Sequence, residues 1–142
     1  MIVGFTGTRI GMTQEQEKVL FFLLKNFQIS QFHHGDCAGA DAQAHKIAEE
    51  LNIFVVIHPP VENGLRAFCK VSQILPEESY LVRDRNIVDR CDLLIGTPKN
   101  YEYVKKGSGT WYTIKYGKDC NKDVLIIFPD GTIKFFGRIN KE

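Results

Sequence analysis

Three short stretches of the sequence combine glycine with hydroxyl-bearing and charged residues, a composition suited to holding an anion. They are Gly7-Thr8-Arg9, Gly35-Asp36-Cys37-Ala38-Gly39-Ala40-Asp41 and Gly107-Ser108-Gly109-Thr110. Glycine lets the backbone approach a ligand closely, and the amide groups that begin a helix favour phosphate. The hydroxyls of Ser108 and Thr110 add donors, and the Arg9 guanidinium adds a charged pair of donors. If the fold brings the three stretches together, they form a binding site for an anionic ligand.

Acidic residues and histidines accompany the second stretch. Asp36 and Asp41 can bind a ribose or a base edge, and both are candidate catalytic carboxylates; alternatively, Asp41 only caps the following helix. His45 lies one helical turn after Asp41, and we expect these two side chains to pair across a helix face. A superficially metal-like group is formed by His33, His34, Asp36, Cys37 and His45. Alternation along a strand places His33 and His34 on opposite faces, so we predict no metal site.

Strands that alternate with helices must position these stretches. Apolar runs predict strands at 1–6, 29–34, 53–58, 93–96 and 124–128. Apolar residues at helical spacing predict helices between these strands, including one over 80–90, and Thr13 with Gln16 forms a possible capping box at the start of the first helix. Residues 61–79 are interpreted as a long loop containing a helical turn. After the turn Pro129-Asp130-Gly131, residues 132–136 return as an antiparallel edge strand.

This order of elements predicts a single α/β domain over residues 1–142. We expect a Rossmann-like fold in which helices flank a mostly parallel sheet of about five strands, with a C-terminal antiparallel edge strand. In such sheets ligands bind beyond the carboxyl ends of the strands, and we expect all three glycine-containing stretches to lie there: two follow strands, and the third precedes a helix. None of them matches a dinucleotide fingerprint or a Walker A loop, so we expect no bound cofactor.

Composition narrows the function classes. The chain has 18 basic and 17 acidic residues, and this balance argues against a surface that tracks nucleic acid phosphates. Its four cysteines are scattered, which favours reduced thiols and a cytoplasmic protein over a disulfide framework. No apolar run approaches the roughly 20 residues that a membrane span needs, and no signal-peptide pattern opens the sequence. We expect no membrane association.

Four motifs occur in order along residues 1 to about 128. They are Gly4-Phe5-Thr6-Gly7-Thr8-Arg9, the stretch His34 to Asp41 followed by Ala44-His45, Arg85-Asn86 with Asp92-Leu93-Leu94-Ile95, and Ser108-Gly109-Thr110-Trp111-Tyr112-Thr113. Together they resemble the SLOG superfamily, which joins the DNA-processing protein A domain to the cytokinin-activating phosphoribohydrolases. The resemblance implies a Rossmann-like fold that binds a nucleotide-derived molecule, adds Arg85 and Asn86 to the candidate ligand-binding residues, and implies a homo-oligomer.

One position departs from the phosphoribohydrolase pattern. That branch carries Pro-Gly-Gly-x-Gly-Thr-x-x-Glu, whose glutamate takes part in cleaving the N-glycosidic bond, and here Thr113 stands at the position of the glutamate. A hydroxyl of ordinary pKa cannot replace a carboxylate as a base. We therefore expect a protein that senses or sequesters a nucleotide-derived molecule, such as a cyclic or ADP-ribose-like signal. The alternative is a nucleoside 5′-monophosphate N-glycosidase with a relocated carboxylate at Asp36, Asp41 or Asp84.

Overall fold

The computed structural model describes residues 1–61, 66–67, 69, 73–105 and 108–137. Along this part of the chain the elements are β1 (Ile2–Gly7), α1 (Gln14–Asn26), β2 (Gln31–His34), α2 (Ala40–Glu50), β3 (Val55–Ile57), β4 (Gln73–Ile74), α3 (Tyr80–Arg90), β5 (Leu93–Thr97), α4 (Gly109–Asp119), β6 (Asp123–Ile127) and β7 (Ile133–Phe136). None of the helices in the described residues is both long and apolar enough to cross a membrane.

The strands form one sheet in the order β4-β3-β2-β1-β5-β6-β7. All neighbouring strands are parallel except β6 and β7, which pair antiparallel. The predicted Rossmann-like fold and its antiparallel C-terminal edge are therefore confirmed. β4 was not predicted, because Gln73 and Ile74 are both exposed and lie inside the segment interpreted as a loop. The chain builds outward from β1 in both directions, so the carboxyl end of β1 is the topological switch point where such folds bind ligands.

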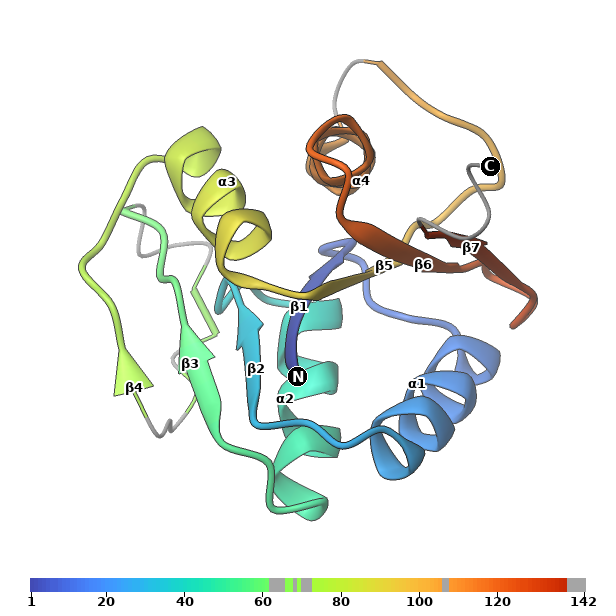
Figure 1. The fold of residues 1–142 in the computed structure, drawn as a ribbon, viewed down its shortest axis with the longest axis horizontal. Helices are drawn as coiled ribbons and strands as arrows, with labels where there is room; N and C mark the ends of the chain where they lie inside the picture. The colour runs from blue at the N-terminus through green and yellow to red at the C-terminus, as the bar shows by residue number, and fades with distance from the viewer. Residues whose placement is uncertain (62–65, 68, 70–72, 106–107, 138–142) are drawn as a thin grey trace.

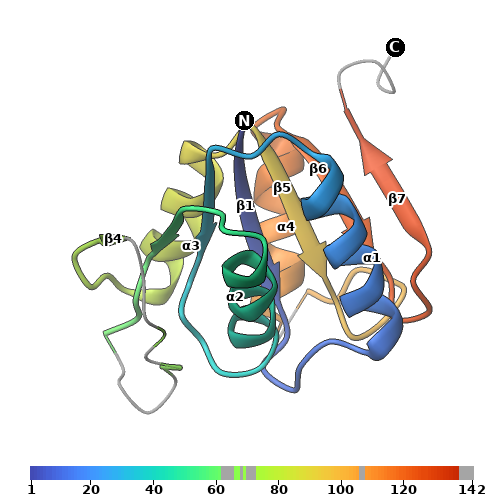
Figure 2. The ribbon, with the colours of Figure 1, turned by 90° about the horizontal axis from the view of Figure 1, so that it is seen from below.

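Two helices cover each face of the sheet, with α1 and α2 on one side and α3 and α4 on the other (Figure 1). Seen from below, α1 and α2 lie in front of the strands (Figure 2). The larger apolar core lies on the α1–α2 side and includes Val3, Phe5 and Phe32. A smaller core, with Leu94 and Trp111, lies under α3 and α4. Both faces are thus buried, which explains why the central strands read as continuous apolar runs.

The predicted capping box at the start of α1 is present. Thr13 Oγ1 accepts from the Gln16 amide at 3.1 Å, and Gln16 Oε1 accepts from the Thr13 amide at 2.9 Å. Gln16 Nε2 also donates to the carbonyl oxygens of Pro98 at 2.8 Å and Ile127 at 2.9 Å. The buried Gln16 side chain therefore fixes the start of α1 to the carboxyl ends of β5 and β6.

Candidate functional site

A cleft of about 590 Å³ lies at the carboxyl end of β1. The turn after β1 forms one wall with Gly7, Thr8 and Arg9, and the start of α4 forms another with Ser108, Gly109 and Thr110. Lys99 and Lys105 add two further cations, and no acidic residue is found among the described residues that line the cleft. Three positive side chains without a carboxylate give the cleft a positive potential that favours an anionic ligand.

The start of α4 is a capped helix N-terminus at the wall of the cleft. Ser108 is the N-cap, and its hydroxyl oxygen accepts from the Trp111 amide at 3.2 Å. The amides of the first helical turn lack intrahelical partners, and Gly109 and Thr110, which carry two of them, line the cleft. Ser108 therefore organises the terminus in addition to lining the cleft. Gly107, which was predicted to belong to this site, lies outside the described residues.

A small cavity of about 30 Å³ adjoins the cleft and connects it to the second glycine-containing stretch. The two spaces share Gly7, Arg9 and Thr110 as walls. The small cavity is also lined by Gly35, Cys37, Asp41, Arg83 and Asp84. Its volume is about that required by one water molecule. The three stretches identified in the sequence therefore do meet in space, around two adjoining cavities.

Asp41 is buried beside the small cavity, and it does not cap α2. The N-cap of that helix is Gly39, which makes no side-chain cap bond, whereas Asp41 Oδ2 accepts from the Cys37 amide in the preceding loop at 3.1 Å. The pKa of Asp41 is raised to about 7, mainly by burial and also by the nearby Asp84, against the opposing effects of Arg83 and of backbone amides. The carboxyl group therefore changes its protonation state near neutral pH.

Asp84 provides a second buried carboxyl group on the same cavity. Burial raises its pKa to about 6, against the opposing effects of Arg83 and the Thr113 hydroxyl. Asp84 Oδ1 lies 3.6 Å from Arg83 Nη2, and Asp84 Oδ2 has no hydrogen-bond partner among the described residues. The Thr113 hydroxyl, which donates to the Gly109 carbonyl at 2.8 Å, is thus close enough to influence this carboxyl group.

Arg83 is a site residue that sequence reasoning missed. A charged side chain on a helix is usually solvated, but that of Arg83 is only 3% exposed. Its Nη1 donates to the Gly35 carbonyl at 3.0 Å and to Cys37 Sγ at 3.3 Å. A Cβ at Gly35 would collide with this guanidinium, which explains the glycine. The available signal was periodicity, because Arg83 lies one helical turn before the buried Ile87.

Two predicted ligand-binding residues of the second stretch serve the fold. Asp36 is fully buried, and its carboxylate accepts from Arg66 Nε at 3.0 Å and from the Cys69 amide at 2.9 Å. It lines neither the cleft nor the small cavity. Gly39 has a φ of 90°, and a Cβ there would meet the Arg9 carbonyl. Asp36 therefore anchors the segment after β3, and Gly39 permits close packing against the turn after β1.

Arg85 and Asn86, which were predicted to bind the ligand together, lie at two different places in the structure. Arg85 is exposed on α3, and its Nε donates at 3.0 Å to the hydroxyl of Tyr112, which lines the cleft. Asn86 lines a separate cavity between α3 and the end of β3. Arg85 therefore reaches the cleft only through Tyr112, and the structure does not place Asn86 in it.

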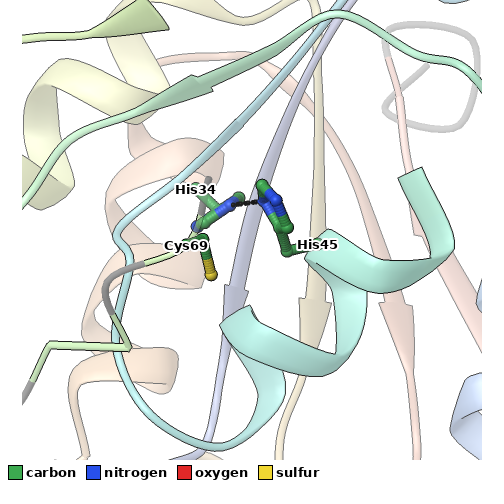
Figure 3. A group of neighbouring side chains, drawn as sticks. All are labelled: His34, His45 and Cys69. Carbon is green, nitrogen blue, oxygen red and sulfur yellow. Dashed lines mark hydrogen bonds between the residues drawn. The ribbon is translucent and has the colours of Figure 1, made fainter. Parts of the chain in front are cut away.

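The four histidines form two buried pairs on opposite faces of β2. His33 Nδ1 lies 2.8 Å from His58 Nε2, and His34 Nε2 lies 2.9 Å from His45 Nδ1. The predicted alternation of His33 and His34 is confirmed. The predicted pairing of His45 with Asp41 is wrong, because His34 occupies the Nδ1 side of the His45 ring (Figure 3). Burial is the main cause that lowers the pKa of His33 to about 4 and that of His58 to about 3.

Cys69 joins the second pair, and ligand atoms of His34, His45 and Cys69 lie within 4.8 Å of one another. We call these residues the His-Cys cluster (Figure 3). The Asp36 amide donates to His34 Nδ1 at 2.9 Å, so the ring proton is on Nε2 and donates to His45. Burial and Asp36 raise the pKa of the Cys69 thiol to about 12. Without a bound ion, the cluster is a hydrogen-bonded group in which one ring nitrogen of His34 and one of His45 are paired with each other.

The fold is similar to two solved structures. TM1055, a structural genomics target, superposes with a TM-score of 0.63 at 16% identity, over 87% of this chain and 71% of its own. DNA processing protein A from Streptococcus pneumoniae superposes with a TM-score of 0.63 at 18% identity, over 87% of this chain and 49% of its own. The chain thus spans about half the length of the latter protein. No protein-family model and no curated protein matches the sequence.

Proposed function

The chain has the Rossmann-like fold that the SLOG-type motifs predicted. On this basis we propose that the chain binds a nucleotide-derived small molecule in the cleft at the end of β1. The observation that carries this proposal is the combination of three cations, a helix N-terminus and no carboxylate among the described residues that line the cleft. The cleft also lies at the switch point of the sheet, which is where such folds bind ligands. The ligand is sensed or sequestered as a cyclic or ADP-ribose-like signal.

The residues that line the cleft indicate where the phosphate group and the base of the ligand bind. A phosphate group binds at Gly109 and Thr110, where the first amides of α4 and the positive helix end stabilise it, with Arg9 as the charged donor. Tyr112 lines the cleft and can stack on a base, whereas the neighbouring Trp111 is buried and donates to Asn100. The ring available to a nucleobase is therefore that of Tyr112.

Thermal unfolding in the presence of a nucleotide panel tests this proposal. A ligand at a concentration of one hundred times its Kd stabilises the folded state by about 2.7 kcal/mol, so the melting temperature rises by several degrees. Arg9→Gln removes one charged contact and should weaken binding roughly tenfold or more, whereas Lys46→Gln changes an exposed charge on α2 and should have no effect. A flat response across the panel, with the native protein folded, contradicts the proposal.

A second candidate function, the N-glycosidase, is favoured by the carboxyl pair beside the cleft. Asp41 and Asp84 line a cavity with room for one water molecule, and Asp84 lies beside Thr113, which stands at the position of the glutamate in the phosphoribohydrolase motif. With pKa values of about 7 and about 6, one group can be protonated while the other is ionised. Such a pair can supply a general acid and a general base.

Release of free base from nucleoside 5′-monophosphates distinguishes the two functions. If the chain is an N-glycosidase, Asp84→Asn and Asp41→Asn should each lower the rate by roughly a hundredfold or more. Asp119→Asn, which removes an exposed carboxylate paired with Lys115, is the matched control and should leave the rate unchanged. Tight binding without release of base identifies the chain as a binding protein.

We also propose that the protein is cytoplasmic and self-associates. All four cysteines are free, which fits a reducing compartment, and α3 exposes the apolar side chains of Leu81 and Val82 next to the cleft. Apolar side chains exposed side by side are a feature of association surfaces. Light scattering on the full chain tests self-association, and a monomer at micromolar concentration contradicts it.

A further inference from the structure

A second cavity, which we call the side pocket, lies between α3 and the end of β3, apart from the cleft. Its volume is about 180 Å³. Pro59, Leu75 and Pro76 provide apolar walls, and the polar lining is His58, Glu78, Arg83, Asn86 and Arg90. None of the described residues of the three glycine-containing stretches lines it. The nucleotide-binding function proposed above does not use this space.

Donors dominate the polar lining of the side pocket. Within the described residues, the Arg90 guanidinium and the Asn86 amide make no hydrogen bond or ion pair with another group. Both lie on α3 and line the same space, so one oxyanion can contact both. Glu78 is the acidic residue of the lining, and it forms no ion pair with Arg90 in the described structure. The lining therefore carries two guanidinium groups against one carboxylate.

The lowered pKa of His58, which follows β3, is consistent with a positive potential in the side pocket. His58 is buried, and after burial and His33, the charges of Arg90 and Arg83 lower its pKa to about 3. Both guanidinium groups are thus close enough to disfavour a further positive charge in this region. The same field favours a negatively charged guest.

Volume limits the size of that guest. A protein cavity of roughly 150 Å³ can hold a benzene molecule, so a space of about 180 Å³ admits a molecule of up to about ten non-hydrogen atoms. We propose that the side pocket binds a small organic anion whose phosphate or carboxylate head contacts Arg90 and Asn86. Its short body packs against Leu75 and the two prolines. A planar guanidinium suits either head group, because both present paired oxygens.

Titration of the isotope-labelled full chain, followed by NMR of the backbone amides and histidine rings, tests the side pocket. The probes are inorganic phosphate, glycerol 3-phosphate and succinate, with glycerol as the uncharged control. We expect saturable shifts at Asn86, Arg90 and His58 at roughly millimolar concentrations of an anion. Tighter binding of glycerol 3-phosphate than of succinate identifies a phosphate site, and the reverse order identifies a carboxylate site.

Variants distinguish a built site from general attraction to positive charge. Arg90→Gln should weaken binding by roughly tenfold or more, since a charged hydrogen-bond donor is lost. Lys46→Gln removes an equal charge from α2 and should leave the affinity unchanged. The proposal is overturned if the two variants weaken binding equally or if no anion saturates. It is also overturned if the shifts are confined to Gly109 and Thr110, which would place the anion in the cleft.

Discussion

Replacing Asp41 with asparagine should remove a buried titration that makes the folded protein less stable as the pH rises. In the folded chain, burial raises the pKa of Asp41 from its ordinary value of 3.8 to about 7. Between these two pH values the folded state keeps a proton that the unfolded state has lost. The stabilisation is therefore complete below about pH 4 and is lost progressively as the pH rises to about 7.

The size of the effect follows from one proton. Each proton that is bound in only one state changes the free energy of unfolding by about 1.4 kcal/mol per pH unit. From pH 5 to pH 7, native Asp41 should thus cost about 2 kcal/mol of stability that Asp41→Asn does not lose, because the folded carboxyl group is still half protonated at pH 7. The asparagine keeps a carbonyl oxygen to accept from the Cys37 amide. Buried His33, His58 and Asp84 also titrate differently on unfolding, but they are common to both proteins, so only the interaction between Asp84 and Asp41 adds to the difference.

Urea unfolding of the native chain, Asp41→Asn and the control Asp119→Asn, repeated at several pH values from 5 to 8, measures this difference. We expect Asp41→Asn to gain stability relative to the native chain as the pH rises to about 7, after which the difference levels off. The curve for Asp119→Asn should run parallel to the native curve, because this carboxylate is exposed. Parallel curves for the native chain and Asp41→Asn would refute a buried carboxyl group that titrates near neutral pH.

Gly39→Ala should cost about 2 kcal/mol or more in chemical denaturation, since it adds a collision with the Arg9 carbonyl to a strained positive φ. Gly131→Ala has a similar φ and a tight contact of 3.3 Å to Glu15 Cβ, but no collision with a carbonyl, so it should cost less, about 1 kcal/mol; equal losses would contradict this packing. His58→Gln should reduce the loss of stability between pH 6 and pH 4 by about 1.4 kcal/mol per pH unit, because His58 takes up a proton near pH 6.5 in the unfolded chain but only near pH 3 in the folded one. Stability measured by urea unfolding that falls equally between pH 6 and pH 4 in both proteins argues against the buried pair. Zinc or a chelator should leave the melting temperature unchanged, and a rise of several degrees with zinc alone would contradict the protonated state of the His-Cys cluster.

Local patterns were enough to predict most of the fold. The apolar runs of β1, β3, β5 and β6 are buried on both faces, so their identity does not depend on distant contacts. The capping box of α1 is likewise a local motif. β4 escaped prediction because its two residues are exposed and carry no periodic signal, and its pairing with β3 depends on a distant part of the chain.

The candidate site was predicted in outline, and the errors concern which side chains meet. Glycine content and topology correctly placed the turn after β1 beside the start of α4. The sequence could not show that Asp36 would bind Arg66, because that contact joins residues thirty positions apart. Arg83 was not among the predicted site residues for a similar reason, since a charge on a helix is usually solvated and the carbonyl of Gly35 that accepts from it is distant in the sequence.

The position of Gln16 shows that a short helix-start motif can also carry long-range information. Its amide nitrogen has two hydrogens, and each is directed to the carbonyl oxygen at the end of a different strand. A glutamate would serve equally well for the helix start alone, but here it would place a negative charge against two carbonyl dipoles and supply no donor. Random replacement at this codon should therefore return only glutamine among stable variants. The residue that caps the helix thus also links the ends of two strands.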